Sequence, residues 1–413
     1  IGADAFWQSI SSGVPGFRRV ELLPYVGTPG AIGGEVSDFT DSSAKKEHLK
    51  DLKKQIKVMC REIQLGVAAA LQAMRHAGLS TGDIPSDRIG VGFGANLMSS
   101  PPEVLMDSVV ASSDADGHFD YSKWGLNEDN RFKGMEPLWL LRYLPNMPGC
   151  HIGIAVDARG PNNSLTLDEA SGGLCVAEAA NIIRRGRADV MITGTTGTRL
   201  NAVKACQAQK WDVLADGDAA NRCRPLDRSR GGEVLSEAAC TLILESRAHA
   251  EKRGAKIWGT LLGTGASCVA GVDGTADEQK AVEQASAMAL QQAGISPADI
   301  GHVNMCASGH PERDRFEARA IHSILGQASS TIPVTALKSY LGSAGSGSAL
   351  CELAGSLLGL DAGIVPRTLN FSDGDADAPL NVVSGDHLPV SNRIFLKTSV
   401  TRMGQASAVI IQA

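Results

Sequence analysis

The sequence lacks the features that mark membrane, secreted or nucleic-acid-binding proteins. It has no run of roughly eighteen or more apolar residues, so no segment is expected to span a membrane. No charged and then apolar stretch follows Ile1, so a secretion signal is not expected. The formal charge is −6, the sequence pI is about 5.9 and no basic patch stands out, so nucleic acid is not an expected partner.

The chain also lacks paired cysteines. No CxxC pair occurs, and no Cys/His spacing is typical of a zinc site. The nine cysteines are scattered singly, at Cys60, Cys150, Cys175, Cys206, Cys223, Cys240, Cys268, Cys306 and Cys351. This usage favours buried thiols in a reducing cytoplasm over a disulfide framework. We therefore expect a cytoplasmic protein that holds no metal and no other cofactor.

What the sequence does contain is an internal repeat. Residues 77–84 read Ala-Gly-Leu-Ser-Thr-Gly-Asp-Ile, and residues 293–300 read Ala-Gly-Ile-Ser-Pro-Ala-Asp-Ile. The two copies lie about half a chain apart, and the composition, with 43% apolar and 20% charged residues, allows one large domain or two halves. The repeat favours two halves that arose by duplication.

Each copy follows an expected amphipathic helix and precedes an expected strand. Gly78 and Gly294 are placed to end the two helices. Thr275 with Glu278 has the spacing of a capping box that would begin the second helix. The strands are expected over 88–93 and 302–306, one in each half.

A second echo joins Ser171–Cys175 to Ser346–Cys351, and both segments begin helices through small residues. The first of these helices is expected to run to about Arg187 and to lead into a strand over 190–192. Helix and strand alternate in both halves, which predicts α/β layers with largely parallel strand pairing.

Several motifs, in one order along the chain, resemble those of the ketosynthases (beta-ketoacyl-acyl-carrier-protein synthases) of the thiolase superfamily. They are Phe6-Trp7, Gly34–Val36, Gly160–Ser164 followed by Arg187–Met191, Cys223–Asp227 followed by Glu237, Lys338–Gly342, and Asp361–Asn370. The resemblance implies a five-layered αβαβα thiolase fold of two duplicated halves, residues 1–250 and 251–413. It also implies that the family's opening strand would precede Ile1.

The resemblance further implies where the chemistry of the family would lie. Ketosynthases use a cysteine nucleophile that accepts an acyl group, and here that position holds Glu169. The family's Cys-Thr-Ser-Gly has become Glu169-Ala170-Ser171-Gly172, where chain-length factors have Gln-Ala-Gly-Gly. A carboxylate is a poor acyl acceptor, and a buried one could also be neutral and act as an amide-like plug.

Two histidines and a glycine loop of the family are replaced as well. The first histidine corresponds to Cys306, with Asp314 and Glu317 fixing the register, and the second corresponds to Ser343. The loop that helps to form the oxyanion hole reads Thr-Arg-Met-Gly-Gln-Ala over 401–406. Lys338 keeps the family's lysine. Four changes at one site indicate that condensation has been lost.

Three other interpretations use residues of the same region. Ser171 could be the nucleophile under a shifted alignment, although it would lack a histidine base. Cys306 could be a nucleophile with His310 as its base, and Glu169 could be a general base. The structural alternatives are a serine at a helix start, a buried thiol and a residue that fills the pocket. Arg402 and Met403 are further candidates for the lining of the pocket.

The leading hypothesis is a non-elongating, chain-length-factor-like subunit of type II fatty-acid or polyketide synthesis. It would pair with an active ketosynthase as a heterodimer, shape the acyl tunnel and work with an acyl carrier protein. The second hypothesis is a stand-alone acyl-thioester enzyme that uses Glu169, Cys306 or Ser171 for acyl transfer, decarboxylation or hydrolysis. The third is a homodimeric scaffold or acyl-binding protein with no catalytic partner.

Overall fold

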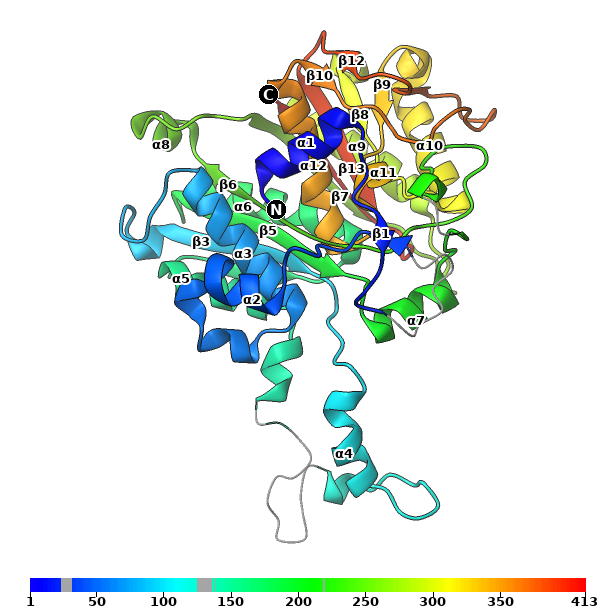
Figure 1. Ribbon diagram of the computed structural model, residues 1–413. Helices are drawn as coiled ribbons and strands as arrows, with labels where there is room; N and C mark the ends of the chain where they lie inside the picture. The colour runs from blue at the N-terminus through cyan, green and yellow to red at the C-terminus, as the bar shows by residue number, and fades with distance from the viewer. Residues whose placement is uncertain (24–31, 125–135, 137, 218–219) are drawn as a thin grey trace.

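The computed structural model describes residues 1–23, 32–124, 136, 138–217 and 220–413 (Figure 1). Its body consists of two β-sheets with helices between them and outside them. No helix among these residues is long and apolar enough to cross a membrane, as the sequence predicts.

The first sheet has the strand order β4-β3-β5-β6. Its strands are β3 (Ile89–Ala95), β4 (Asn162–Leu165), β5 (Val190–Thr198) and β6 (Glu237–Glu245). β3 runs parallel to both β4 and β5, whereas β6 is antiparallel to β5. β3 and β5 are buried along their whole length because helices cover both faces of the sheet.

The second sheet repeats this arrangement, with the order β11-β9-β8-β13-β14-β7. Its strands are β7 (Thr260–Cys268), β8 (His302–Asn304), β9 (Pro333–Thr335), β11 (Asn381–Val382), β13 (Ile394–Val400) and β14 (Gln405–Gln412). The parallel strands β9, β8 and β13 are followed by antiparallel β14, as β4, β3 and β5 are followed by β6. β7 extends the second sheet beyond β14, and no described strand takes the equivalent place beside β6.

Three layers of helices enclose the two sheets. They are α3 (Arg61–His76) and α5 (Met147–Val156) outside the first sheet, α6 (Ser171–Arg184) and α12 (Ser346–Asp361) between the sheets, and α9 (Glu278–Ala293) and α10 (Pro311–Leu325) outside the second. α12 is buried along almost its whole length because it packs on both sheets. The predicted five-layered αβαβα fold is therefore confirmed.

The remaining elements are short and lie around this body. They are α1 (Ala3–Ser12), α2 (Asp41–Ser43), α4 (Glu103–Ala111), α7 (Ala202–Trp211), α8 (Arg247–Lys252), α11 (Lys338–Leu341), β1 (Arg18–Arg19), β2 (Ile32–Gly33), β10 (Ile364–Val365) and β12 (Leu388–Pro389). Figure 1 shows α4 on an arm that leaves the body after β3 and returns to it before α5.

The repeated segments have the predicted structure at most positions. Gly78 follows α3 and Gly294 follows α9, and both glycines have a positive φ, 66° and 67°, that glycine adopts without strain. Both predicted strands form, as β3 and β8, and α6 ends three residues before the predicted Arg187.

The predicted capping box at the start of α9 is wrong. Asp277 caps this helix, because its Oδ1 accepts a hydrogen bond of 2.9 Å from the backbone N–H of Lys280. The hydroxyl of Thr275 instead donates to Asp273 Oδ1 at 2.7 Å, within the preceding turn. A carboxylate one residue before the helix serves as the cap, and the threonine is left to the turn.

Candidate functional site

The residues that the sequence analysis assigns to the catalytic positions of ketosynthases lie where the two sheets meet. Glu169 belongs to the short helix η7 (Asp168–Ala170) that leads into α6, and Cys306 follows the carboxyl end of β8. Ser343 lies in the turn between α11 and α12. The ends of parallel strands and the starts of helices thus meet here, as they do at the sites of other open α/β folds.

Glu169 is held in a buried ion pair. Its side chain is 3% exposed, and its Oε1 lies 2.6 Å from Arg199 Nη2, directly after β5. Burial alone would lower the pKa of Arg199, but the carboxylates of Glu169 and Glu233 outweigh burial and raise it above its usual value. The short contact between the carboxyl and the guanidinium holds the Glu169 side chain in place.

The ion pair continues into a chain of buried charges. Arg199 Nη1 lies 2.9 Å from Glu233 Oε2, and Glu233 Oε1 lies 3.2 Å from Arg313 Nη1. Arg313 also contacts Glu278 at 3.2 Å and donates to the backbone carbonyl of Val400 at 3.1 Å. The two arginines outweigh the effect of burial and lower the pKa of Glu233 to about 2. Fixed charges therefore link the position of the nucleophile to the loop after β13.

Cys306 lies in a second buried polar cluster. Lys338 Nζ donates to the carbonyl of Cys306 at 2.6 Å and to its Sγ at 3.2 Å, and pairs with Glu352 at 2.6 Å. The backbone N–H of Cys306 donates to Glu317 Oε1 at 2.9 Å. Burial raises the pKa of the Cys306 thiol to about 11, so at neutral pH it is a thiol and a weak nucleophile.

His310 has a structural role that separates it from Cys306. Its Nδ1 accepts hydrogen bonds of 3.3 Å from the backbone N–H groups of Glu312 and Arg313, so it caps α10. Within the described chain, the Sγ of Cys306 bonds to Lys338 and Val400 rather than to an imidazole. The general base that the alternative of a cysteine nucleophile requires is therefore not in place.

Both serines are buried, and in the described part of the chain neither hydroxyl is hydrogen-bonded to a histidine; the Ser343 side chain contacts the carboxylate of Glu233. Ser343 is 1% exposed, and its backbone N–H donates to Val234 O at 2.8 Å. Ser171 is the first residue of α6, and its Oγ accepts the N–H of Leu167 at 2.9 Å. It contacts Ser346 Oγ at 3.2 Å, so its neighbours are those of a serine at a helix start.

Arg402 and Met403 were predicted to line the pocket, and in the structure both side chains are exposed to solvent. The Arg402 guanidinium lies 4.6 Å from the ring centroid of Trp211, which is itself half exposed. Met403 is 55% exposed. The loop between β13 and β14 therefore presents a cation and a thioether to solvent.

Sequence reasoning missed two buried ionisable residues at the site, Lys397 and Glu62. Lys397 on β13 lies 2.6 Å from Glu352 Oε2, so two lysines share one carboxylate. Glu62 on α3 is 4% exposed, accepts the Asn96 N–H at 3.2 Å, and has a pKa raised to about 8 by burial. The sequence did contain a signal for Lys397, because a lysine within the mainly apolar strand 394–400 indicates a buried and paired charge. Glu62 gave none, because acidic residues are ordinary in the first turn of a helix.

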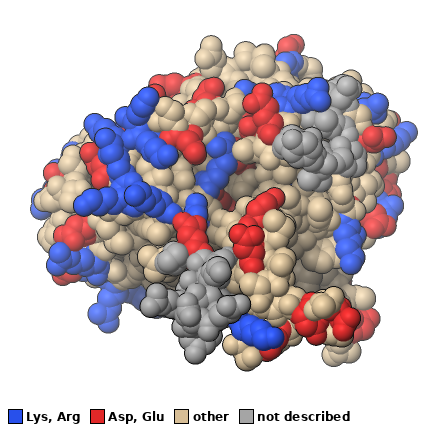
Figure 2. Space-filling model, turned by 60° about the horizontal axis from the view of Figure 1, so that its bottom comes forward, with Lys and Arg blue, Asp and Glu red and all other residues tan. Residues whose placement is uncertain are grey.

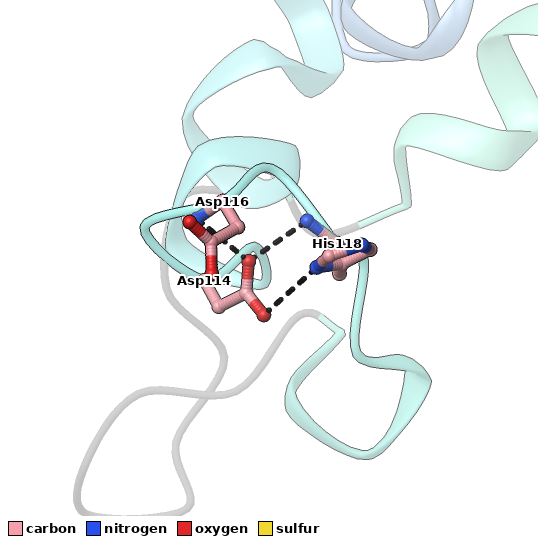
Figure 3. A group of neighbouring side chains, drawn as sticks. All are labelled: Asp114, Asp116 and His118. Atoms are coloured by element: carbon pink, nitrogen blue, oxygen red, sulfur yellow. Dashed lines mark hydrogen bonds and ion pairs between the residues drawn. The ribbon is translucent and has the colours of Figure 1, made fainter.

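One group of side chains in the described part of the chain could hold a metal ion, and it lies on the arm (Figure 3). Asp114, Asp116 and His118 are all exposed there. Asp114 Oδ1 accepts the N–H groups of Asp116 at 3.0 Å and His118 at 2.8 Å, and its Oδ2 lies 3.4 Å from His118 Nδ1. These contacts are those of a tight turn, and they account for the arrangement without an ion.

Comparison with known proteins identifies the family of the chain. Residues 1–250 match the family "Beta-ketoacyl synthase, N-terminal domain", and residues 258–372 match "Beta-ketoacyl synthase, C-terminal domain". The chain belongs to the beta-ketoacyl synthase family. The resemblance seen in the sequence is confirmed.

Relatives and solved structures cover nearly the whole ketosynthase homologue. It is 27% identical over 383 residues to 3-oxoacyl-[acyl-carrier-protein] synthase 2 of Staphylococcus aureus, covering 92% of this chain and 87% of the relative. It is 28% identical over 385 residues to the tetracenomycin polyketide synthase ketoacyl synthase alpha subunit of Streptomyces glaucescens, covering 92% and 86%. The solved ishigamide ketosynthase/chain length factor shares the fold, with a TM-score of 0.84 at 23% identity over 100% of this chain and 95% of that one.

Proposed function

We propose that this homologue is a non-elongating, chain-length-factor-like subunit that pairs with an active ketosynthase in type II fatty-acid or polyketide synthesis. The observation that carries the proposal is the buried Glu169–Arg199 ion pair at the position of the family's nucleophile. A carboxylate in this pair would have to lose its counter-ion to attack a thioester, and the product would be a reactive anhydride.

The rest of the site supports the same conclusion. Decarboxylation of a malonyl thioester requires groups that stabilise the developing enolate. The family's two imidazoles are replaced by the buried Cys306 thiol and the Ser343 hydroxyl. Lys338 does carry a positive charge, but its ammonium already has Glu352 and the Cys306 carbonyl as partners. These two contacts of Lys338 oppose its taking the role of either histidine.

Two adjacent surfaces support a partner of the same fold. β4 is an edge strand, and a groove of about 420 Å³ runs beside it, lined by Leu165, Leu174, Ala177, Glu178, Asn181, Ile182 and Arg185. On the arm, α4 exposes Met106, Val109 and Val110, which have the spacing of one helical face. Exposed apolar side chains on an arm with so little packing of its own favour a surface that a partner covers. We infer that the arm and the edge strand β4 contact the ketosynthase. Met106, Val109 and Val110 of α4 would then line the acyl tunnel that the two subunits share.

A lysine-rich segment supports an acyl carrier protein as the second partner. Residues 45–57 carry six exposed lysines and two acidic residues, and the lysines are Lys45, Lys46, Lys50, Lys53, Lys54 and Lys57. In Figure 2, Lys and Arg gather on the left, the side on which α2 and the turns after it lie in Figure 1. The expectation that no basic patch exists is therefore wrong, because the net charge of −6 averages over acidic regions elsewhere. An acidic carrier protein would be attracted to this segment.

The test is to co-express the chain with an intact Cys-His-His ketosynthase of a type II pathway. We expect a stable complex that extends malonyl units on the carrier protein, and we expect elongation to vanish when the partner's nucleophile is replaced but to persist in Glu169→Gln. Val110→Phe should shorten the product because it narrows the tunnel, whereas Glu103→Gln on the same helix should not.

A different result would overturn the proposal. If the chain alone gained a covalent acyl group or released carbon dioxide from malonyl-carrier protein, and Glu169→Ala or Cys306→Ala abolished that activity, it would be a stand-alone enzyme. A homodimer with no affinity for the ketosynthase would indicate a scaffold or an acyl-binding protein.

A further inference from the structure

Two cysteines from opposite halves of the chain meet between the first sheet and the central helix layer. Cys240 lies on β6, opposite Thr195 of β5, and Cys351 lies in the second turn of α12. The two residues are more than a hundred positions apart in the sequence. They are neighbours here because α12 packs directly on β6.

The surroundings of the two thiols are apolar. Cys351 clusters with Ala238 and Ala344, and Cys240 packs against this cluster together with Phe6 and Leu341. A hydrogen bond with Cys240, together with burial, raises the pKa of Cys351 well above its usual value. Cys351 is 9% exposed, whereas Cys240 is half-buried, so a small reagent meets Cys240 first.

We propose that Cys240 and Cys351 form a reversible disulfide, which joins β6 to α12 under oxidising conditions. A low-molecular-weight disulfide such as oxidised glutathione supplies the oxidising equivalents. The Cys240 thiolate attacks one glutathione sulfur, so that the S–S bond of glutathione breaks, a mixed disulfide forms and one glutathione thiolate leaves. Cys351 then attacks the Cys240 sulfur and displaces the second glutathione thiolate. The two protons that the cysteines lose are taken up by the two glutathione thiolates.

The cross-link would act next to the buried charges. Cys351 immediately precedes Glu352, which pairs with both Lys338 and Lys397. A disulfide at this place fixes the start of α12 to the first sheet and closes a long loop, which constrains the unfolded chain. The oxidised protein should therefore resist unfolding more than the reduced protein. Because attack by Cys351 requires its thiolate, closure should be faster at alkaline pH.

The test uses the full chain with its exposed thiols removed by Cys206→Ser and Cys268→Ser. After incubation with oxidised glutathione, we expect the intact mass to fall by two hydrogen atoms and peptide mapping to link residues 240 and 351. The midpoint of urea unfolding should rise on oxidation and return with a thiol reductant. Adding Cys240→Ser to this background should abolish both the link and the rise, and Cys351→Ser should leave a glutathione adduct on Cys240.

Three results would each overturn the proposal. One is an unchanged mass after prolonged oxidation at alkaline pH. Another is a persistent glutathione adduct at Cys240 while Cys351 is present. The third is a disulfide that maps to a different pair of cysteines.

Discussion

At the scale of single residues, the buried ion pairs that run from Glu169 to Arg313 make the stability of each charged side chain depend on its neighbour. Glu169 and Arg199 are both largely buried, so the removal of Glu169 leaves Arg199 with less counter-charge, and the removal of Arg199 takes from Glu169 its ion-pair partner, in a medium that solvates ions poorly. The same holds for Glu233, which has an arginine on either side. We therefore expect substitutions here to affect stability much more than they affect any activity of the chain itself.

Glu169→Ala should lower the free energy of unfolding by about 3 kcal/mol, because it leaves a buried guanidinium partly unpaired. Glu169→Gln should cost less, since an amide oxygen can still accept a hydrogen bond from Arg199. Urea unfolding monitored by circular dichroism measures both. As a control, Glu251→Ala removes one partner of the exposed Arg247–Glu251 pair and should cost less than about 1 kcal/mol. Equal effects at the two sites would contradict this account.

Glu62 should make stability fall as the pH rises. Its pKa is about 8 in the fold against an ordinary value of 4.5, so the folded protein binds the proton more tightly than the unfolded chain does. The protonated Glu62 contributes its full stabilisation below the unfolded pKa of 4.5, and this contribution is lost as the pH rises to the folded pKa of about 8. Over this range the free energy of unfolding should fall by at most ~1.4 kcal/mol per pH unit. Glu62→Gln should flatten this slope in unfolding curves recorded between about pH 5 and 9. Glu103→Gln, an exposed acid, should leave it unchanged.

The sequence singled out Glu169 and Cys306 but not the residues that contact them. Alignment to a family motif locates Glu169 or Cys306 because only the order along the chain matters. Arg199 comes from the end of the next strand, and Lys397 from a strand far along the chain, so their contacts depend on how the sheets are laid together. The contact of Cys306 with Lys338 instead of His310 also depends on the three-dimensional packing and could not be read from the order of the motifs.

At the scale of elements, glycines predicted two helix ends correctly, whereas the capping signal assigned one helix start to the wrong residue. Gly78 and Gly294 were identified because a positive φ is nearly specific to glycine. The start of α9 was assigned to the wrong residue, because Thr275 and Asp277 are both residue types that commonly cap helices.

The two candidate caps of α9 can be separated by mutation. Asp277→Ala should lower the free energy of unfolding by about 1 kcal/mol, because the N–H of Lys280 loses its acceptor. Thr275→Val should cost less than about 0.5 kcal/mol, as is usual for a substitution at an exposed site. Thermal unfolding of the two variants beside the parent measures the difference. The reverse order would restore the capping box predicted from the sequence.

At the scale of the whole molecule, charge is distributed unevenly. The chain is acidic overall, yet residues 45–57 present six exposed lysines. The field of such a segment acts over about a Debye length, roughly 10 Å at moderate salt, so it directs the approach of an acidic partner.

Reversing two of these charges should weaken binding of the carrier protein. We expect Lys53→Glu with Lys54→Glu to raise the Kd at least about tenfold at low salt and to reduce its dependence on salt. The matched control is Lys252→Glu with Lys280→Glu, which makes the same change in net charge at exposed positions elsewhere. Calorimetry with the carrier protein at two salt concentrations distinguishes them. Equal weakening by both pairs would show that net charge, not the segment, governs binding.

The Glu169–Arg199 pair also bears on how such a protein can evolve. A change of Glu169 to cysteine would introduce a thiol, yet it would remove one of the counter-ions of buried Arg199 and would supply neither imidazole. If the protein is the non-elongating subunit that we propose, a variant with this one change would be less stable and still inactive. Selection for stability would act against such a variant, so the ion pair would oppose a return to catalysis by mutations taken one at a time.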